Sequence, residues 1–183
     1  LTPGAWVESA VAIGLEWCGD RRVGGGDVED GGDAKTALVI RRGPIVETVE
    51  GRTEGNTRKT AQWFVTRCNL HGAAILVYDS IGVGAGIHGE LTAENRTFEH
   101  RGCNWGTSPT EVTWGDRTAK ELFQDLRAQL HWRLRIRFEK THEHYTECQG
   151  FEDCRHQPRD LISLPDDPNL TGEVSILKFE SAR

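Results

Sequence analysis

The chain has 183 residues, of which 37% are hydrophobic and 27% charged, and its formal net charge at pH 7 is −6. This length suits one domain with a sizeable core and is too short for two ordinary domains. The composition excludes a largely disordered or fibrous protein, and the sequence contains no apolar run of about 18 residues that would predict a membrane span. The acidic balance argues against a protein that coats nucleic acid non-specifically, because affinity for phosphate is mostly electrostatic.

The first half of the chain predicts elements in the order β-β-β-α-β-α. Asn56 and Thr57 are both N-cap candidates for a run of apolar residues at helical spacing, which stops around His71 and Gly72. The continuous apolar run 73–79 is typical of a buried strand, and it closes on Asp79. We expect a short helix that begins near Pro3 and ends near Gly14, a helix at 57–71, and a helix that follows the turn at 80–86 and runs through Leu91. We expect strands at 21–28, 36–42, 45–50 and 73–79.

The second half predicts a fifth strand at 98–105, a loop at 106–115 and one long helix from Thr118 to Glu147. The fold class is therefore α/β, with a mixed sheet of three antiparallel strands followed by parallel strands and with helices packed against it. The long helix is predicted from apolar side chains that recur every four residues on one face. These are Leu122, Leu126, Leu130, Leu134 and Phe138.

Two acids, Asp27 and Asp79, each end a predicted strand. In α/β sheets, ligands bind beyond the carboxyl ends of the strands, so adjacent strand ends would bring these acids to one site. Oxygen ligands suit magnesium or manganese, and two such ions would support phosphodiester hydrolysis, with Asp33 assisting the second ion. The alternative is that Asp27, Asp30 and Asp33 populate a solvated turn, since Asp and Gly are ordinary turn residues.

The glycine-rich segment before Lys35 and Thr36 does not form a phosphate-binding loop. The G-x-x-x-x-G-K-[ST] pattern would require glycine at positions 29 and 34, where the chain has Glu29 and Ala34. Acids inside such a loop would also repel phosphate. The sequence therefore predicts no ATP hydrolysis.

The five cysteines, an odd number without a Cys-x-x-Cys pair, indicate neither a disulfide framework nor a standard zinc ribbon. They fit a reducing setting. Two of them fall close to three histidines, at spacings that match no standard zinc finger, so a structural zinc site and a chance grouping are both open. This group is His142, His144, Cys148, Cys154 and His156.

Segments 26–35 and 77–86, each containing one of the two acids, resemble the C-terminal nuclease domain of the large terminase subunits of tailed bacteriophages. The second segment is the more specific. The likeness continues through 114–116, 128–138 and 160–165, and so it covers nearly the whole chain. The resemblance implies an RNase H-like endonuclease that cuts concatemeric double-stranded viral DNA by a two-metal mechanism.

The same resemblance implies site residues and partners. Asp27 and Asp79 match the family's first two metal-binding acids, and Asp33 matches an acid near the same site. The implied partners are viral DNA, an ATPase domain in cis, the small terminase subunit and the portal or procapsid, with no membrane, and the implied location is the host cell cytoplasm.

The family's third acid lies in a Ser-Pro-Asp stretch that the chain does not contain. We therefore expect residues 1–183 to be a single nuclease domain, truncated at its C-terminus and separated from the ATPase domain. Without the third acid, the second ion should bind weakly and cutting should be slow or absent. The nearby substitutes are Asp160, Asp166 and Asp167.

Basic side chains on the long helix, and Arg101 before the predicted loop, are candidates for contacts to DNA phosphates. Arg133, Arg137 and Lys140 give the helix a basic end, although a solvated helix face explains them equally well. Two other functions stay open: a non-catalytic RNase H-like module that docks on portal or DNA, and an RNase H-like resolvase or integrase core.

Overall fold

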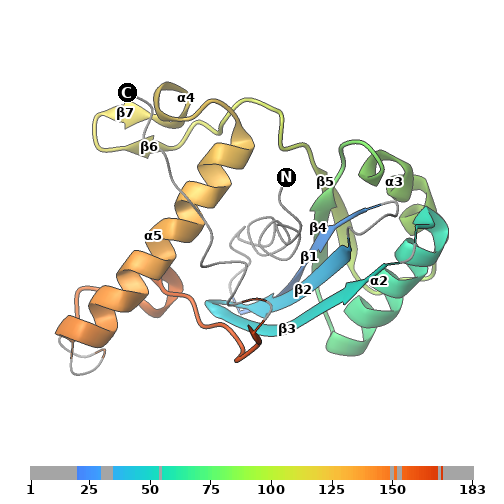
Figure 1. The fold of residues 1–183 in the computed structure, drawn as a ribbon, viewed down its shortest axis with the longest axis horizontal. Helices are drawn as coiled ribbons and strands as arrows, with labels where there is room; N and C mark the ends of the chain where they lie inside the picture. Colours follow the sequence, from blue (N-terminus) through green and yellow to red (C-terminus); the bar gives the residue numbers. More distant parts are fainter. Residues whose placement is uncertain are drawn as a thin grey trace.

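Five strands form one mixed sheet in the order β3-β2-β1-β4-β5 (Figure 1). The computed structural model describes residues 20–29, 35–53, 55–148, 151, 154–168 and 170. The predicted arrangement is confirmed: β1, β2 and β3 pair antiparallel, and β4 lies parallel to both β1 and β5. The strands are β1 (Arg22–Asp27), β2 (Thr36–Arg42), β3 (Ile45–Arg52), β4 (Ile75–Asp79) and β5 (Glu99–Cys103).

One face of the sheet is covered by α2 (Thr57–His71) and α3 (Gly84–Ala93) (Figure 1). The ends of α2 lie where the sequence predicts them. The Asn56 side chain accepts a hydrogen bond from a backbone N–H of the first turn, and Gly72 ends the helix with a φ of 62°. The core beneath these helices includes Leu38, Ile40, Phe64, Leu76, Tyr78 and Ile87.

The opposite face is covered by α5 (Leu126–Glu147) and by the segment that returns after it. The backbone of Ser163 in this segment accepts a hydrogen bond from the N–H of Val46 (2.8 Å) and donates one to the carbonyl of Pro44 (2.9 Å). The returning segment therefore joins α5 to the start of β3. The side chains buried between them and the sheet include Ala37, Val39, Val46, Leu134, Ile162 and Leu170.

The prediction of a single helix over 118–147 was wrong. Residues 123–125 separate two helices, α4 (Ala119–Leu122) and α5. Phe123 has an extended backbone, and the Asp125 side chain caps a new helix by accepting a hydrogen bond from a backbone N–H of its first turn. The leucine repeat is accordingly not one stripe, and Leu122 is 36% exposed. A short hairpin, β6 (Thr113–Trp114) and β7 (Arg117–Thr118), begins within the loop predicted at 106–115 and ends just after it.

The structure joins Cys148 and Cys154 by a disulfide, which the cysteine pattern did not predict. The reason is local: α5 ends and the chain turns back within six residues, which brings the two Cα atoms to 5.5 Å, a separation that a disulfide spans. Cys68 is buried and Cys103 is half-buried, and both pack among apolar side chains.

Some expectations fall outside the described residues. They are the short helix expected between Pro3 and Gly14, and Asp33 within the acidic turn. The two ends of the acidic turn are described and are tied together, because the hydroxyl of Thr36 bonds both the N–H and the carbonyl of Glu29. None of the described helices is long and apolar enough to cross a membrane.

Candidate active site

Asp27 and Asp79 end two neighbouring parallel strands. The paired register of β1 and β4 ends with Gly26 opposite Tyr78, and Asp27 and Asp79 are the next residue on each strand. Neighbouring strands lie about 4.8 Å apart, which leaves the two carboxyl groups within reach of one ion. The structure therefore brings together the two acids that the sequence singles out.

Both acids lie on the face of the sheet that α5 covers. Along β4 the side chains alternate, so that Tyr78 belongs to the core under α2 and α3, whereas Val77 packs with Leu130 of α5. Asp79 follows Val77 by two residues and shares its face, and Asp27 shares it through the parallel register. Asp27 is only 8% exposed. Two carboxylates in such a place repel each other unless a proton or a cation intervenes.

The surroundings of Asp79 disfavour a bare carboxylate. Burial raises the pKa of Asp79, and this effect outweighs two smaller ones that lower it, a hydrogen bond from the backbone N–H of Ile81 and the positive charge of Arg127. The Ile81 N–H donates to Asp79 Oδ1 at 2.9 Å and so fixes one of the two oxygens. A bound cation would restore the ionised form, and oxygen donors suit a hard divalent ion.

Arg127, in the first turn of α5, is a site residue that the sequence patterns did not reveal. Its guanidinium acts electrostatically on Asp79 and lies 5.6 Å from the ring centroid of Trp105. Its backbone N–H donates to the carbonyl of Trp105 (3.1 Å), which ties the start of α5 to the loop after β5. A recognised N-cap at Asp125 would have placed Arg127 in a first turn, whereas a helix starting at Thr118 places it mid-helix.

Arg101 lies on the same face of the sheet as the two acids. In the parallel register of β4 and β5, Arg101 is opposite Val77 and Cys103 is opposite Asp79. Residues paired across parallel strands point to the same side, so Arg101 is two positions from the strand neighbour of Asp79. Its side chain is exposed. Arg101 is therefore the predicted DNA-contacting residue that the fold places beside the acids.

The other predicted DNA-contacting residues lie further along α5. Arg137 donates through Nη1 to the carbonyls of Arg159 and Leu161 (2.7 and 2.8 Å), and burial lowers its pKa. Lys140 forms an ion pair with Asp160 at 3.4 Å. Arg133 is one turn before Arg137. Arg137 is thus hydrogen-bonded, and Lys140 ion-paired, to the returning segment.

The proposed substitutes for a third acid are not brought to the pair. Asp160 faces Lys140, which is thirteen residues after Arg127, and this spacing is about 20 Å along a helix. Asp167 accepts a hydrogen bond from the N–H of Leu170 (3.2 Å). Among the described residues, the only group of three or more His, Cys, Asp and Glu side chains arranged to hold a metal ion lies elsewhere, at the end of α5.

The fold of this chain is similar to that of solved viral nuclease domains. The nuclease domain of the large terminase subunit gp2 of bacterial virus Sf6 has a TM-score of 0.70 and 23% identity, over 87% of this chain and 70% of that one. This chain has a terminase nuclease fold. Point mutants of the same gp2 domain, one with manganese and beta-thujaplicinol and one with calcium, give TM-scores of 0.71 and 0.70 at 23% and 24% identity, with the same coverage.

The RNase H-like architecture expected from the sequence is thereby confirmed. No family model and no curated protein matches the sequence. The likeness to these structures, at 23–24% identity, shows the layout of strands and helices.

Proposed function

We propose that this chain is a divalent-metal-dependent nuclease domain that cuts double-stranded DNA, with Asp27 and Asp79 as ligands of the catalytic ion. The observation that carries the proposal is the placement of these two acids side by side at the carboxyl ends of β1 and β4. The manganese and calcium present with solved domains of the same fold support a divalent ion.

The chain's own groups fit this chemistry. The N–H of Ile81 holds Oδ1 of Asp79, and the second oxygen of Asp79 is the one we assign to the ion, together with the carboxylate of Asp27. Magnesium or manganese, when bound, supplies an activated water and a counter-charge for the leaving oxygen. Arg127 and Arg101 lie on the same side of the sheet as the acids and would bind DNA phosphates there. We assign Asp33 to the second ion.

At the finer level, we propose that the substrate is concatemeric viral DNA and that the domain works within a terminase. This rests on the resemblance of segments 26–35 and 77–86 and on the shared fold. The partners would be an ATPase domain in cis, the small terminase subunit and the portal of a procapsid in the host cytoplasm. Arg137 and Lys140 would then contribute at most a secondary DNA contact, given their bonds to the returning segment, and Arg133, one turn before Arg137, would add to the same contact.

A plasmid-cutting assay with magnesium or manganese tests the proposal. Wild type should cut, and Asp27→Asn and Asp79→Asn should lower the rate by at least about a hundredfold, since even outer partners of metal ligands cost 10- to 100-fold. Asp166→Asn is the matched control, because Asp166 is an exposed acid in the returning segment. Equal cutting by wild type and Asp79→Asn would show that the assignment is wrong.

A second candidate is a non-catalytic module that docks on DNA or a portal. The observation that favours it is that, in the described part of the chain, Asp27 and Asp79 do not belong to a three-ligand group. This candidate predicts DNA binding without cutting at any concentration of manganese. Measurable cutting that requires Asp27 would exclude it.

A further inference from the structure

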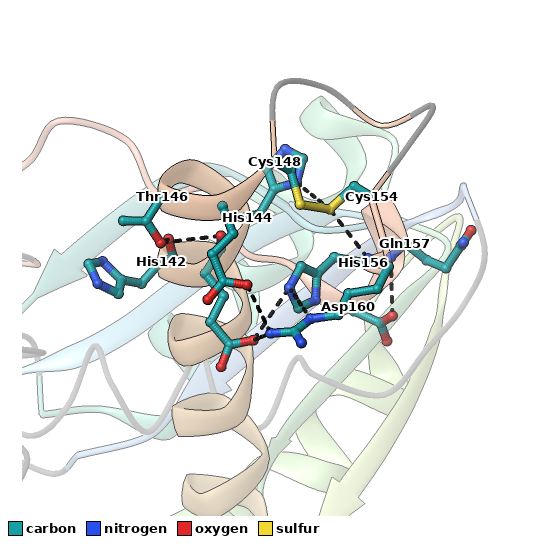
Figure 2. Close-up of a disulfide and its surroundings, with 11 residues drawn as sticks. His142, His144, Thr146, Cys148, Cys154, His156, Gln157 and Asp160 are labelled. Atoms are coloured by element: carbon teal, nitrogen blue, oxygen red, sulfur yellow. Dashed lines mark hydrogen bonds and ion pairs between the residues drawn. A yellow bond between two sulfur atoms is a disulfide. The ribbon is translucent and has the colours of Figure 1, made fainter.

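The carboxyl end of α5 gathers sulfur and nitrogen atoms from both sides of a chain reversal (Figure 2). One ligand atom each from His144, Cys148 and Cys154 lie within 4.8 Å of one another. Nδ1 of His144 is 3.2 Å from Sγ of Cys154. The ring of His156 follows at 6.5 Å from that of His144, centroid to centroid, and its backbone N–H donates to Sγ of Cys154 at 3.5 Å. Four side chains of the types that bind zinc thus converge.

The helix itself sets the spacing of the first two side chains. His144 and Cys148 are four residues apart, and the N–H of Cys148 donates to the carbonyl of His144 (3.1 Å), so both leave the same side of the helix end. Cys154 and His156 face them from the returning segment (Figure 2). His142 points away from the disulfide in the same view, which excludes it from the group.

Carboxylates lie around the group in positions that suit a metal site. Nε2 of His156 is 3.4 Å from Oε2 of Glu143, and the His156 residue is only 5% exposed. Arg155 pairs with both Glu143 and Glu147 (2.9 and 3.2 Å), and its Nε is 3.3 Å from His156 Nε2. Because Nε2 of His156 accepts a hydrogen bond from Arg155 Nε–H and also lies beside Glu143, Nδ1 is the ring nitrogen left for an ion.

We propose that His144, Cys148, Cys154 and His156 form a Cys2His2 site for one zinc ion when the two cysteines are reduced. A thiol reductant, oxidised to its own disulfide, supplies the two electrons and two protons that convert the disulfide to two thiols; a phosphine supplies the electrons and becomes the phosphine oxide, with the oxygen and the two protons coming from water. The thiols lose these protons as their sulfurs bind the ion, so the disulfide and the zinc complex exclude each other. Sulfur and imidazole donors select zinc over magnesium or manganese, which prefer oxygen.

The zinc would be structural. His144 is seventeen residues after Arg127, about 25 Å along α5, so the ion would be far from the acid pair. It would join the end of α5 to the returning segment. Further along, that segment accepts hydrogen bonds from Arg137 at the carbonyls of Arg159 and Leu161, and it contacts β3 through Ser163. The returning segment would thereby be held at both of its ends.

Cobalt and zinc binding to the whole chain, purified in a phosphine reductant and freed of metal, tests the proposal. We expect one equivalent of cobalt to give thiolate charge-transfer absorption and a tetrahedral d–d band, zinc to displace it, and zinc to raise the melting temperature. Charge-transfer absorption reports only on sulfur ligands, so ions bound at Asp27 and Asp79 do not contribute to it.

Variants then assign the ligands. Cys154→Ser, His144→Gln and His156→Gln should each weaken zinc binding by at least about a hundredfold, because even outer partners of zinc ligands cost 10- to 100-fold. His142→Gln and Cys103→Ser are the matched controls and should bind as wild type does. The proposal is overturned if the reduced, folded wild type shows no thiolate absorption with cobalt, or if His144→Gln or His156→Gln binds zinc as tightly as His142→Gln.

Discussion

Gly84 lies against the backbone of Asp79 so closely that there is no room for a side chain. A Cβ atom placed on Gly84 would sit 1.9 Å from the carbonyl oxygen of Asp79. The first residue of α3 is thus pressed onto the end of the strand that carries the acid. Gly26, just before Asp27, is similarly confined, since its Cβ would lie 2.9 Å from ring atoms of Phe64. Each acid therefore has a neighbouring glycine that the packing requires.

Replacement of Gly84 should disturb the acid as well as the fold. We expect Gly84→Ala to lower the free energy of unfolding by about 3 kcal/mol or more, because overpacking against backbone cannot be relieved by a rotamer change. Gly89→Ala in the same helix is the control, since nothing lies within 4 Å of its Cβ position, and it should gain up to about 1 kcal/mol. Urea denaturation measures both. Equal stabilities for the two variants would contradict the close contact.

The stability of the fold should fall in mild acid because of His131. Burial is the main cause that lowers the pKa of His131 to about 4, whereas an unfolded histidine titrates near 6.5. Between these values the unfolded chain binds a proton that the folded chain does not, so stability decreases as the pH falls through this window. The loss at pH 4 should be on the order of 3 kcal/mol.

Denaturation midpoints measured from pH 7 to pH 4 test whether His131 causes the loss of stability in acid. His131→Phe should lose this part of the pH dependence, since phenylalanine cannot be protonated and still packs near Trp105, whose ring centroid is 5.5 Å away. The exposed His142, changed to Gln, should leave the slope as in wild type. An unchanged slope in His131→Phe would mean that other groups cause the acid sensitivity.

Arg137 should matter more for stability than for DNA binding. Arg137→Met keeps the aliphatic stem but removes the hydrogen bonds to the carbonyls of Arg159 and Leu161, which should cost about 1–3 kcal/mol. Arg133→Met is the control and should stay within about 0.5 kcal/mol of wild type. Denaturation and the salt dependence of DNA binding separate the roles. A stable Arg137→Met with weakened DNA binding would instead identify a phosphate contact.

Arg127 should affect the pKa of Asp79. Its positive charge lowers the pKa of Asp79, against the larger effect of burial. In the metal-free chain, Arg127→Leu should therefore raise the pKa of Asp79 further, whereas Arg127→Lys should keep it near the wild-type value. Carboxyl carbon NMR titration follows Asp79 directly. The electrostatic link is absent if Arg127→Leu and wild type titrate at the same pH.

Metal binding should stabilise wild type and not Asp79→Asn. A ligand at one hundred times its dissociation constant adds about 2.7 kcal/mol to the free energy of unfolding. Without metal, Asp79→Asn should be at least as stable as wild type at pH 7, because burial disfavours the charge and the amide oxygen can still accept from Ile81. Thermal melts with and without manganese measure both effects. An equal manganese-dependent shift in the two proteins would contradict a role for Asp79 as ligand.

Local patterns predicted the sheet and the acid pair well, for a physical reason. Runs of β-branched and apolar residues mark strands in any context, and Asn56 and Gly72 are helix ends whose preferences are local. Asp79 stood out because it closes such a run, and Asp27 because it closes a predicted strand that is rich in glycine. The sequence predicted that adjacent strand ends would bring the two acids together, and the pairing of β1 with β4 supplies that adjacency.

Contacts distant in sequence were not predictable in the same way. The leucine spacing continues across the break at Phe123, so periodicity alone could not end the helix, although the capping side chain of Asp125 was a local signal. The bonds of Arg137 depend on a segment more than twenty residues later. The disulfide between Cys148 and Cys154 is a different case: the two residues are six apart, but their approach depends on the chain reversal after α5, which the cysteine spacing does not encode.

The most direct test of the central claim is a crystal structure of the chain soaked with manganese, with anomalous scattering recorded at the manganese edge. If both acids bind the ion, an anomalous peak should lie within about 2.5 Å of carboxylate oxygens of both Asp27 and Asp79. The peak should be absent from crystals of Asp79→Asn. A well-ordered site with no peak between these two acids would contradict it.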